Sequence, residues 1–298
     1  MSLSYVSGTG DMPLRYRTIG EAFDETFARH GDRLALVVRH QRLRWTWREL
    51  AERVDRCAAG FVALGLEVGD RIGIWAPNCA EWLVTQLASA RAGLILVTIN
   101  PAYRSTELTH ALHLGGVRAL VIAERFKTSD YVALLESVAP EIATAGSAPL
   151  RLDAFPLLEF IIQIGAPHYP ALLGFDHVAD TAVAPWRAEL DRRAALMTPD
   201  DPINIQFTSG TTGAPKGATL THHNILNNGF FVARGMALTS EDALCIPVPL
   251  YHCFGMVMGV LGCVTHGAAM IFPDAGFDAQ ATLAAIAEER CTALFGVP

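Results

Sequence analysis

A run of small, hydroxyl-bearing residues around one lysine is the part of this sequence that most clearly carries chemistry. Residues 208–217 read Thr-Ser-Gly-Thr-Thr-Gly-Ala-Pro-Lys-Gly, with three glycines, four hydroxyl groups and Lys216. The chain has only one other lysine, Lys127. Glycines let a ligand approach the backbone closely, and hydroxyl and ammonium groups bind phosphate oxygens. The run therefore predicts a loop that binds a polyphosphate.

This loop differs from the best-known phosphate-binding motifs. A Walker A loop has a second glycine where Pro215 stands, and a Ser or Thr where Gly217 follows Lys216. The sequence also contains no G-x-G-x-x-G fingerprint. A flexible loop that binds nothing is the simpler alternative. However, residues 203–207 predict a strand that runs into the loop, and ligands of α/β proteins bind at the carboxyl ends of strands, so we favour phosphate binding.

A histidine follows a second predicted strand. Residues 243–248 are apolar, and the segment Pro-Leu-Tyr-His after them ends at His252, before a glycine-rich run. Side chains at strand ends line clefts in α/β proteins, so His252 is a candidate site residue. The alternative is a core histidine whose hydrogen bonds are satisfied by its neighbours.

The other histidines and the cysteines predict no metal site. Cys253, Cys263 and His266 match no zinc-binding spacing, and the six cysteines include no C-x-x-C pair. His222 and His223 stand together at the start of a predicted helix, where adjacent side chains diverge. We therefore assign this pair no catalytic role.

Local signals mark the elements that position these residues. Capping boxes of the form S/T-x-x-E begin at Thr18 and Thr46, and each predicts the start of a helix. We expect these helices to end near Gly31 and Gly65, at a glycine in the left-handed conformation. The apolar runs between the two helices, 34–38 and 43–45, predict a β-hairpin.

Strands and helices alternate through the rest of the chain. Further strands are predicted at 71–76, 94–98, 119–123, 160–164 and 268–272, and helices at 79–92, 131–138, about 255–266 and from near residue 221. Residues 139–152 and 179–201 are rich in Pro, Ala and charge and are expected to be surface connections. The alternation implies crossover connections and a largely parallel sheet covered by helices, which is an α/β fold.

Length and composition exclude several classes of protein. The 298 residues are 51% hydrophobic and 18% charged, which predicts a compact chain of about two domains' length. A net charge of −7 argues against binding to nucleic-acid phosphates. Residues 243–273 carry no charged side chain, but prolines and glycines interrupt them, so we predict no transmembrane segment. Without a signal-like N-terminus or disulfide pattern, the sequence predicts a cytoplasmic protein.

The motifs together resemble one family. Residues 208–224 closely resemble the signature loop of the adenylate-forming enzymes, which include acyl-CoA synthetases, luciferases and peptide-synthetase adenylation domains. Residues 69–78, 99–103 and 249–256 also look like segments of that family. The resemblance implies an acyl-CoA synthetase-like large N-terminal domain of two interleaved α/β lobes.

The resemblance also implies how the chain divides. Residues from about 71 to 232, including the phosphate loop, are expected to form the first lobe. Residues from about 18 to 66, together with 240–298, are expected to begin the second lobe.

The resemblance further assigns roles to single residues. It implies that the β- and γ-phosphates of ATP are bound by Thr208, Ser209, Gly210, Thr211, Thr212, Gly213 and Lys216. It places His252 beside the reacting carboxylate, in an acyl pocket lined or gated by Phe254, Gly255, Met256 and Met258. In this family a carboxylate attacks the α-phosphorus of ATP and pyrophosphate leaves. The acyl adenylate then passes to a thiol, usually that of coenzyme A.

The acyl substrate is expected to be a medium- to long-chain fatty acid. Residues 243–273 include no acidic side chain that would bind the ammonium group of an amino acid. Gly255, Gly259 and Gly262 are predicted to share one helix face, which either leaves a groove for an alkyl chain or allows close helix packing. Coenzyme A and a carrier-protein thiol both stay open as acceptors, as does assembly into a homo-oligomer.

The later motifs of the family find no match in the chain. These are the segment that contacts adenine and Mg²⁺, the aspartate that holds the ribose, and the small C-terminal domain with its catalytic lysine. The resemblance therefore implies an incomplete N-terminal part of a ligase that is inactive alone, with its Mg²⁺ ligand beyond residue 298. The alternative is a truncated chain that binds nucleotide or lipid without turnover.

Overall fold

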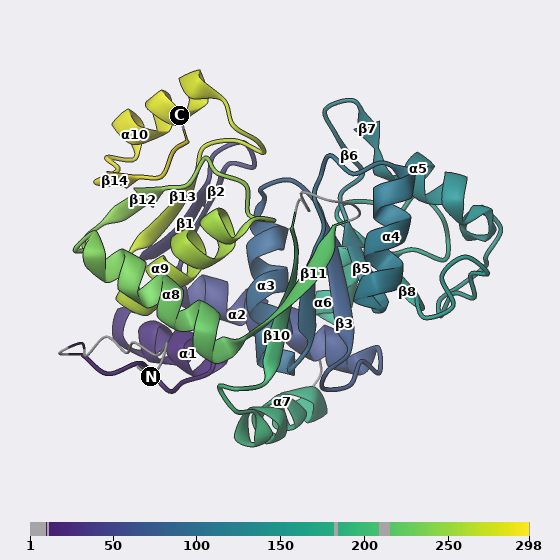
Figure 1. Ribbon diagram of the computed structural model, residues 1–298, viewed down its shortest axis with the longest axis horizontal. Coiled ribbons are helices and arrows are strands. Elements are labelled where there is room, and N and C mark those ends of the chain that lie inside the picture. Colours follow the sequence, from purple (N-terminus) through teal and green to yellow (C-terminus); the bar gives the residue numbers. More distant parts are fainter. Residues whose placement is uncertain (1–9, 11, 182–183, 209–214, 298) are drawn as a thin grey trace, which may run out of the picture.

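The computed structural model describes residues 10, 12–181, 184–208 and 215–297, and most of its strands belong to two sheets (Figure 1). The five-stranded sheet has the order β14-β12-β13-β1-β2. Its strands are β1 (Leu34–Val38), β2 (Leu43–Thr46), β12 (Ala243–Cys245), β13 (Ala269–Phe272) and β14 (Ala293–Leu294). β1 pairs with β13 in parallel, so the first hairpin joins a sheet built mostly from the last part of the chain.

The seven-stranded sheet has the order β11-β10-β4-β3-β5-β8-β9. Its strands are β3 (Arg71–Trp75), β4 (Ile95–Thr98), β5 (Val117–Ile122), β8 (Phe160–Gln163), β9 (Leu173–Gly174), β10 (Pro202–Thr208) and β11 (Lys216–Thr221). All its pairings are parallel except the one between β10 and the edge strand β11. A separate short ribbon pairs β6 (Arg125–Phe126) with β7 (Ser129–Asp130).

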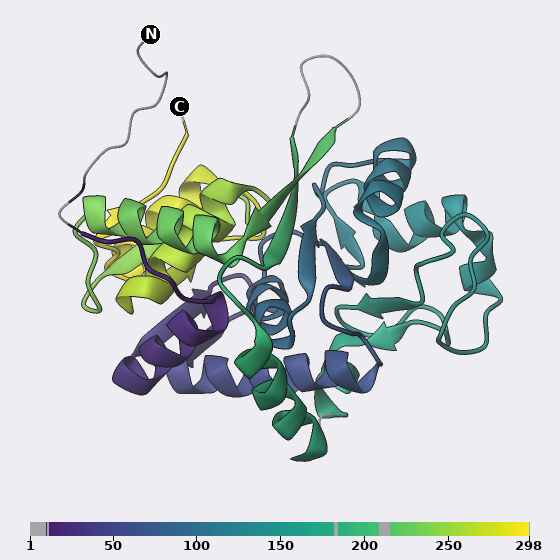
Figure 2. The same ribbon diagram turned by 60° about the horizontal axis from the view of Figure 1, so that its bottom comes forward.

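Helices cover both sheets. They are α1 (Ile19–His30), α2 (Trp47–Ala63), α3 (Ala80–Ala92), α4 (Ser105–Gly115), α5 (Tyr131–Val138), α6 (Phe175–Asp180), α7 (Ala184–Leu196), α8 (His222–Gly235), α9 (Gly262–His266) and α10 (Ala279–Glu288). A 3-10 turn, η1 (Pro140–Ala143), and a π-helix, η2 (Phe254–Leu261), complete the described elements. The π-helix packs with α9 against α8. Figures 1 and 2 show the β10–β11 hairpin between the elements of the five-stranded sheet and the rest of the seven-stranded sheet.

One continuous core joins the two sheets. It includes the fully buried Trp47 of α2, Trp82 of α3 and Leu36 of β1, together with Ile72 of β3. Helices α2 and α3 pack closely on each other in the middle of this core. A second cluster around Trp75 and Tyr131, whose ring centroids are 3.9 Å apart, covers the other face of the larger sheet.

Most of the predicted elements are confirmed. Both capping boxes form, with Thr18 accepting from the backbone N–H of Glu21 and Thr46 from that of Glu49. The hairpin of β1 and β2 is present. The π-helix and α9 follow each other where one buried helix was expected, and α9 ends at Gly267 in the left-handed conformation. No described helix is long and apolar enough to cross a bilayer.

Two local expectations are wrong, and one strand was not predicted. Gly31, after α1, has φ −47° and is therefore right-handed, whereas Gly65 has the expected positive φ. Residues 184–196, expected within a surface connection, form α7, because Glu189 pairs with arginines one turn away and Leu190 is buried. Residues 216–221, for which no strand was predicted, form the edge strand β11. The helix expected from near residue 221 follows this strand and begins at His222, with Thr221 as its N-cap.

Candidate functional site

The β10–β11 hairpin carries the predicted phosphate loop. Thr208 ends β10 and Lys216 begins β11, and these two residues are partners in the antiparallel register. The Thr208 hydroxyl donates to the Lys216 carbonyl at 3.5 Å, and both residues are exposed. The residues expected to bind phosphate between them, Ser209, Gly210, Thr211, Thr212 and Gly213, lie outside the described residues. The structure therefore places the two ends of the loop, at the carboxyl end of β10.

A pocket of about 400 Å³ lies beside the loop end of this hairpin. It is lined by Thr98, Asn100, Tyr103, Gln206, Phe207, Thr208, Pro215, Tyr251, His252 and Cys253. These residues come from the ends of β4 and β10, from the start of β11 and from the segment that follows β12. Because β4 and β10 are parallel neighbours, their carboxyl ends open at the same edge of the sheet. We call this the hairpin pocket.

The backbone around His252 fixes the orientation and tautomer of its ring. The Phe254 N–H donates to His252 Nδ1 at 3.1 Å, and Cys253 Sγ lies 3.6 Å from the same nitrogen. Since Nδ1 accepts a hydrogen bond, the neutral ring carries its proton on Nε2. His252 is exposed and lines the hairpin pocket with Thr208. Its Nε2–H is thus a donor suited to an anionic oxygen.

The other residues expected to line the acyl pocket are not among those lining the hairpin pocket. Phe254 is half-buried and packs on Phe295 with ring centroids 4.9 Å apart. Met256 is buried, and its sulfur accepts a hydrogen bond from Gln206 Nε2 at 2.9 Å. Met258 is half-buried and packs against the main core.

The glycines of this segment allow close packing and leave no shared groove. A Cβ added at Gly255 would lie 2.4 Å from the Pro249 carbonyl oxygen, and one at Gly259 would lie 3.1 Å from the Ile246 side chain. At Gly262 the nearest atom is the Cβ of Ala233, on α8. The three glycines therefore face three different neighbours, which favours the packing alternative over the alkyl groove.

Sequence reasoning missed the polar floor of the hairpin pocket. Thr98 is 2% exposed and its hydroxyl has no hydrogen-bond partner among the described residues. It pairs in register with Gln206, which is 9% exposed. Tyr103 and Tyr251 complete the lining, and burial raises the pKa of both phenols. The signal was a polar residue at the end of the apolar strand β4 and a second polar residue within β10, but only the strand order brings the two together.

A second pocket, of about 360 Å³, shares Asn100 and Tyr251 with the first. Its lining includes Arg104 and Lys127, the lysine for which the sequence suggested no role. Lys127 Nζ lies 5.4 Å from the centroid of the Phe126 ring. The two pockets thus meet at Asn100 and Tyr251, and the second pocket adds two cationic side chains to its lining. We call the second one the lysine pocket.

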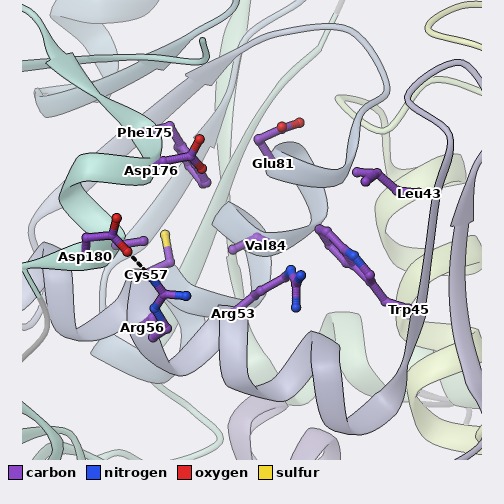
Figure 3. Close-up of a pocket in the computed structure, with 11 residues that line it drawn as sticks. Leu43, Trp45, Arg53, Arg56, Cys57, Glu81, Val84, Phe175, Asp176 and Asp180 are labelled. Carbon is purple, nitrogen blue, oxygen red and sulfur yellow. Dashed lines mark hydrogen bonds and ion pairs between the residues drawn. The ribbon is translucent and has the colours of Figure 1, made fainter. Parts of the chain in front are cut away.

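A third pocket lies elsewhere, between α2, β2, α3 and α6 (Figure 3). Its volume is about 510 Å³, and Arg56 forms an ion pair with Asp180 across it. Arg53 lies over the Trp45 ring, 4.3 Å from its centroid. No residue of the hairpin pocket lines it, so it is separate from the chemistry predicted here. Among the described residues, no three His, Cys, Asp or Glu side chains gather as metal ligands.

Comparison with known proteins agrees with this geometry. Residues 23–298 match the AMP-binding enzyme family. The chain is 41% identical to the mouse medium-chain acyl-CoA ligase ACSF2, mitochondrial, over 99% of its own length and 49% of that protein. It superposes on the anthranilate CoA ligase AuaEII in complex with anthranoyl-AMP with a TM-score of 0.80 at 21% identity, covering 96% of this chain and 50% of that one.

A further solved relative is ATP-bound MatB from Rhodopseudomonas palustris, at 26% identity and a TM-score of 0.70 over 95% of this chain and 50% of that one. The chain thus spans about half the length of the relatives it matches. The cytoplasmic expectation is contradicted, because the mouse relative is named as mitochondrial. The expectation relied on the lack of a recognisable leader, which is weak evidence about compartment.

Three findings agree on one family: the match over residues 23–298, the superposed fold, and the pocket at the carboxyl ends of β4 and β10. This chain belongs to the AMP-binding enzyme family, with the α/β fold of the N-terminal domain of adenylate-forming acyl-CoA ligases.

Proposed function

We propose that this chain carries the ATP and acyl sites of a fatty acyl-CoA synthetase. The observation that supports it most directly is the hairpin pocket, where both ends of the glycine- and hydroxyl-rich loop meet His252. Its substrate is a medium-chain fatty acid, consistent with the apolar segment 243–273 and with the name of the mouse relative. We further propose that each of the two sheets belongs to one of the two lobes, because the hairpin pocket is lined from the strand ends of the larger sheet and from the segment after β12 of the smaller one.

The proposed reaction begins with ATP in the loop. Lys216 and the hydroxyl of Thr208 hold the β- and γ-phosphates together with the hydroxyls of the loop. His252 Nε2–H donates to the fatty acid carboxylate or to an α-phosphate oxygen. The carboxylate attacks the α-phosphorus and pyrophosphate leaves. Fixed donors and a cation stabilise the charge that grows on the leaving group.

Magnesium is the usual companion of ATP in this chemistry. No Asp or Glu lines the hairpin pocket, so the described residues supply no carboxylate ligand for Mg²⁺ there. We therefore assign no step of the reaction to the metal. A carboxylate ligand for the ion is expected outside this chain.

The acceptor thiol is proposed to be coenzyme A. The lysine pocket adjoins the hairpin pocket and offers Arg104 and Lys127 to an anionic co-substrate. A carrier protein would also bring a thiol on a phosphorylated arm, and nothing in the pocket lining separates the two acceptors. We expect Lys127→Ala to raise the KM for coenzyme A severalfold while pyrophosphate exchange keeps its rate. An unchanged KM for coenzyme A would remove this pocket from the proposal.

Pyrophosphate exchange in the full-length gene product tests the proposed function. With ATP, Mg²⁺ and octanoate, the exchange of labelled pyrophosphate into ATP is expected, and it should stop when octanoate is omitted. Omission of coenzyme A should leave the exchange intact, because adenylation precedes the thiol. Nucleotide binding without any exchange, for fatty acids of every length, would instead support a non-catalytic binding protein.

A further inference from the structure

One thiol of this chain lies in the hairpin pocket. The described cysteines fall into two groups, with Cys57, Cys79, Cys245 and Cys263 buried and Cys253 and Cys291 half-buried. Cys253 lines the hairpin pocket, whereas Cys291 lies beside β14 and packs into the small cluster under α10. The exposed part of Cys253 therefore lies in the pocket where an acyl adenylate would bind.

A base lies within reach of this thiol. Cys253 Sγ is 3.6 Å from His252 Nδ1, within the range of a hydrogen bond to sulfur. The Phe254 N–H also donates to Nδ1, which fixes that nitrogen as the acceptor of the ring. The geometry is that of a cysteine whose proton can pass to the neighbouring imidazole, as in other histidine-activated cysteines.

The pocket also holds a buried polar group without a partner. Thr98 lines the same pocket, and only 2% of its surface is exposed. Its hydroxyl has no hydrogen-bond partner among the described residues. Buried hydroxyls are normally paired, so a partner outside the protein is the simplest account. The Thr98 hydroxyl oxygen lies just below the pocket surface, so a rotation of this side chain is needed before it can donate to the carbonyl oxygen of a bound acyl group.

We propose that Cys253 is a self-acylation site, which takes the acyl group from a medium-chain acyl adenylate when no outside thiol is in place. This inference rests on the proposed function, because the adenylate is its acyl donor. It goes beyond that function by giving the protein a covalent thioester state of its own.

The step balances without a further reagent. Cys253 gives its proton to His252 Nδ1, which loses its hydrogen bond from the Phe254 N–H as it is protonated, and the sulfur attacks the carbonyl carbon of the acyl adenylate. The carbon–sulfur bond forms as the bond between that carbon and the bridging oxygen of the anhydride breaks. AMP leaves with the electron pair of this bond, and the imidazolium then releases its proton to water. The products are S-acyl Cys253, AMP and a proton.

The location predicts competition with coenzyme A. Cys253 and Tyr251 both line the hairpin pocket, and Tyr251 also lines the lysine pocket through which the acceptor is proposed to enter. Cys253 and the acceptor thiol would then attack the same carbonyl carbon. Coenzyme A should therefore suppress the acylation, and the acylated protein should be blocked toward a second adenylate.

Synthetic octanoyl adenylate, supplied to the full-length gene product without ATP or coenzyme A, tests the proposal. Intact-mass and peptide analysis should show one octanoyl group on Cys253, removable by neutral hydroxylamine. Cys253→Ser should lose this thioester label. Cys291→Ser is the matched control, since Cys291 is the other half-buried cysteine, and its label should be unchanged. His252→Gln should slow labelling of Cys253 at least tenfold, because the thiol then has no imidazole beside it to take its proton.

The outcomes separate this proposal from the function it rests on. Pyrophosphate exchange in the same preparation reports adenylation, while the supplied adenylate bypasses that step. Exchange with octanoate but no thioester on Cys253 would overturn self-acylation and leave the proposed function standing. Equal labelling of Cys253 and Cys291 would also overturn it, since it would show reaction of any accessible thiol. Thermal unfolding of each variant confirms that a lost label does not reflect a lost fold.

Discussion

At the residue scale, the phosphate loop can be tested through its two described ends. Thr208 and Lys216 face each other across β10 and β11, and we propose that each contributes one contact to the phosphates of ATP. A hydrogen bond to a charged group is worth roughly 1.5 to 3 kcal/mol. We therefore expect Lys216→Ala or Thr208→Val in the full-length gene product to slow pyrophosphate exchange by about ten- to hundredfold. Rates within twofold of the parent for both variants would remove the loop from the mechanism.

A buried histidine outside the pocket gives the fold a dependence on pH. His222 is fully buried at the start of α8, where its Nδ1 accepts the Ile19 N–H at 3.1 Å and its Nε2 has no partner among the described residues. Burial lowers its pKa to about 4, although Asp201 and Glu21 oppose the shift. These contacts place His222 in the core, against the start of α1.

The sign of the pH effect follows from this lowered pKa. Below the ordinary histidine pKa of about 6.5 the unfolded chain binds a proton that the folded chain does not bind until about pH 4. The free energy of unfolding should therefore fall by about 3 kcal/mol as pH drops across this window. Urea titrations between pH 7 and pH 4 measure it. His222→Gln should flatten the dependence of this free energy on pH, while His223→Gln should not. If the free energy of unfolding falls with the same slope in both variants, His222 is excluded as the cause.

At the element scale, the glycines of the π-helix segment test packing against the groove alternative. A Cβ at Gly255 would meet the Pro249 carbonyl oxygen at 2.4 Å, and this backbone atom cannot rotate away. We expect Gly255→Ala to lower the free energy of unfolding by about 1 to 3 kcal/mol, the usual cost of overpacking. Gly146→Ala is the control, because nothing lies within 4 Å of its Cβ position. Chemical denaturation compares the two.

The packing around Gly259 predicts the effect of a larger side chain there. Its Cβ position lies 3.1 Å from the Ile246 side chain, inside the core rather than in a groove. Gly259→Leu should therefore destabilise the protein without shortening the preferred fatty acid. A shorter chain-length profile in a variant of normal stability would restore the groove alternative.

Local signals predicted most of the elements, because capping boxes and apolar runs act within one turn or one strand. They failed where partners far along the chain decide the structure. The edge strand β11 forms because β10 offers it an antiparallel partner, and α7 forms with Arg193 buried against the Ala92 carbonyl. The same holds for the residues that line the hairpin pocket. His252 and Thr208 were predicted, while Thr98 was not, since its neighbour β10 is set by the sheet order.

At the scale of the whole molecule, the two sheets share one core but expose several edges. Strands β14 and β2 end the smaller sheet, and β11 ends the larger one. Beside β14, Leu294 and Val297 are exposed apolar side chains, and so is Leu283 of α10. Unpaired edges next to apolar side chains favour association between copies. We expect purified residues 1–298 to form concentration-dependent oligomers in sedimentation experiments, and Leu294→Lys to reduce them. A monomer at every concentration tested would contradict this.

Catalysis is expected to require more than this chain. The hairpin pocket offers donors for phosphate and carboxylate, but no carboxylate for Mg²⁺, and the relatives it matches are about twice as long. Orientation of reactants contributes roughly 7 to 11 kcal/mol to the rates of well-placed reactions, so a site that holds only part of ATP loses most of its rate. We therefore expect residues 1–298, given ATP, Mg²⁺, octanoate and coenzyme A, to release no measurable pyrophosphate and to form no octanoyl-CoA. Because the phosphate loop and His252 are present, the same chain should still bind ATP weakly, with Lys216→Ala reducing that binding. Sustained octanoyl-CoA formation at a rate near that of the full-length gene product would show that the described pocket holds every group the chemistry needs.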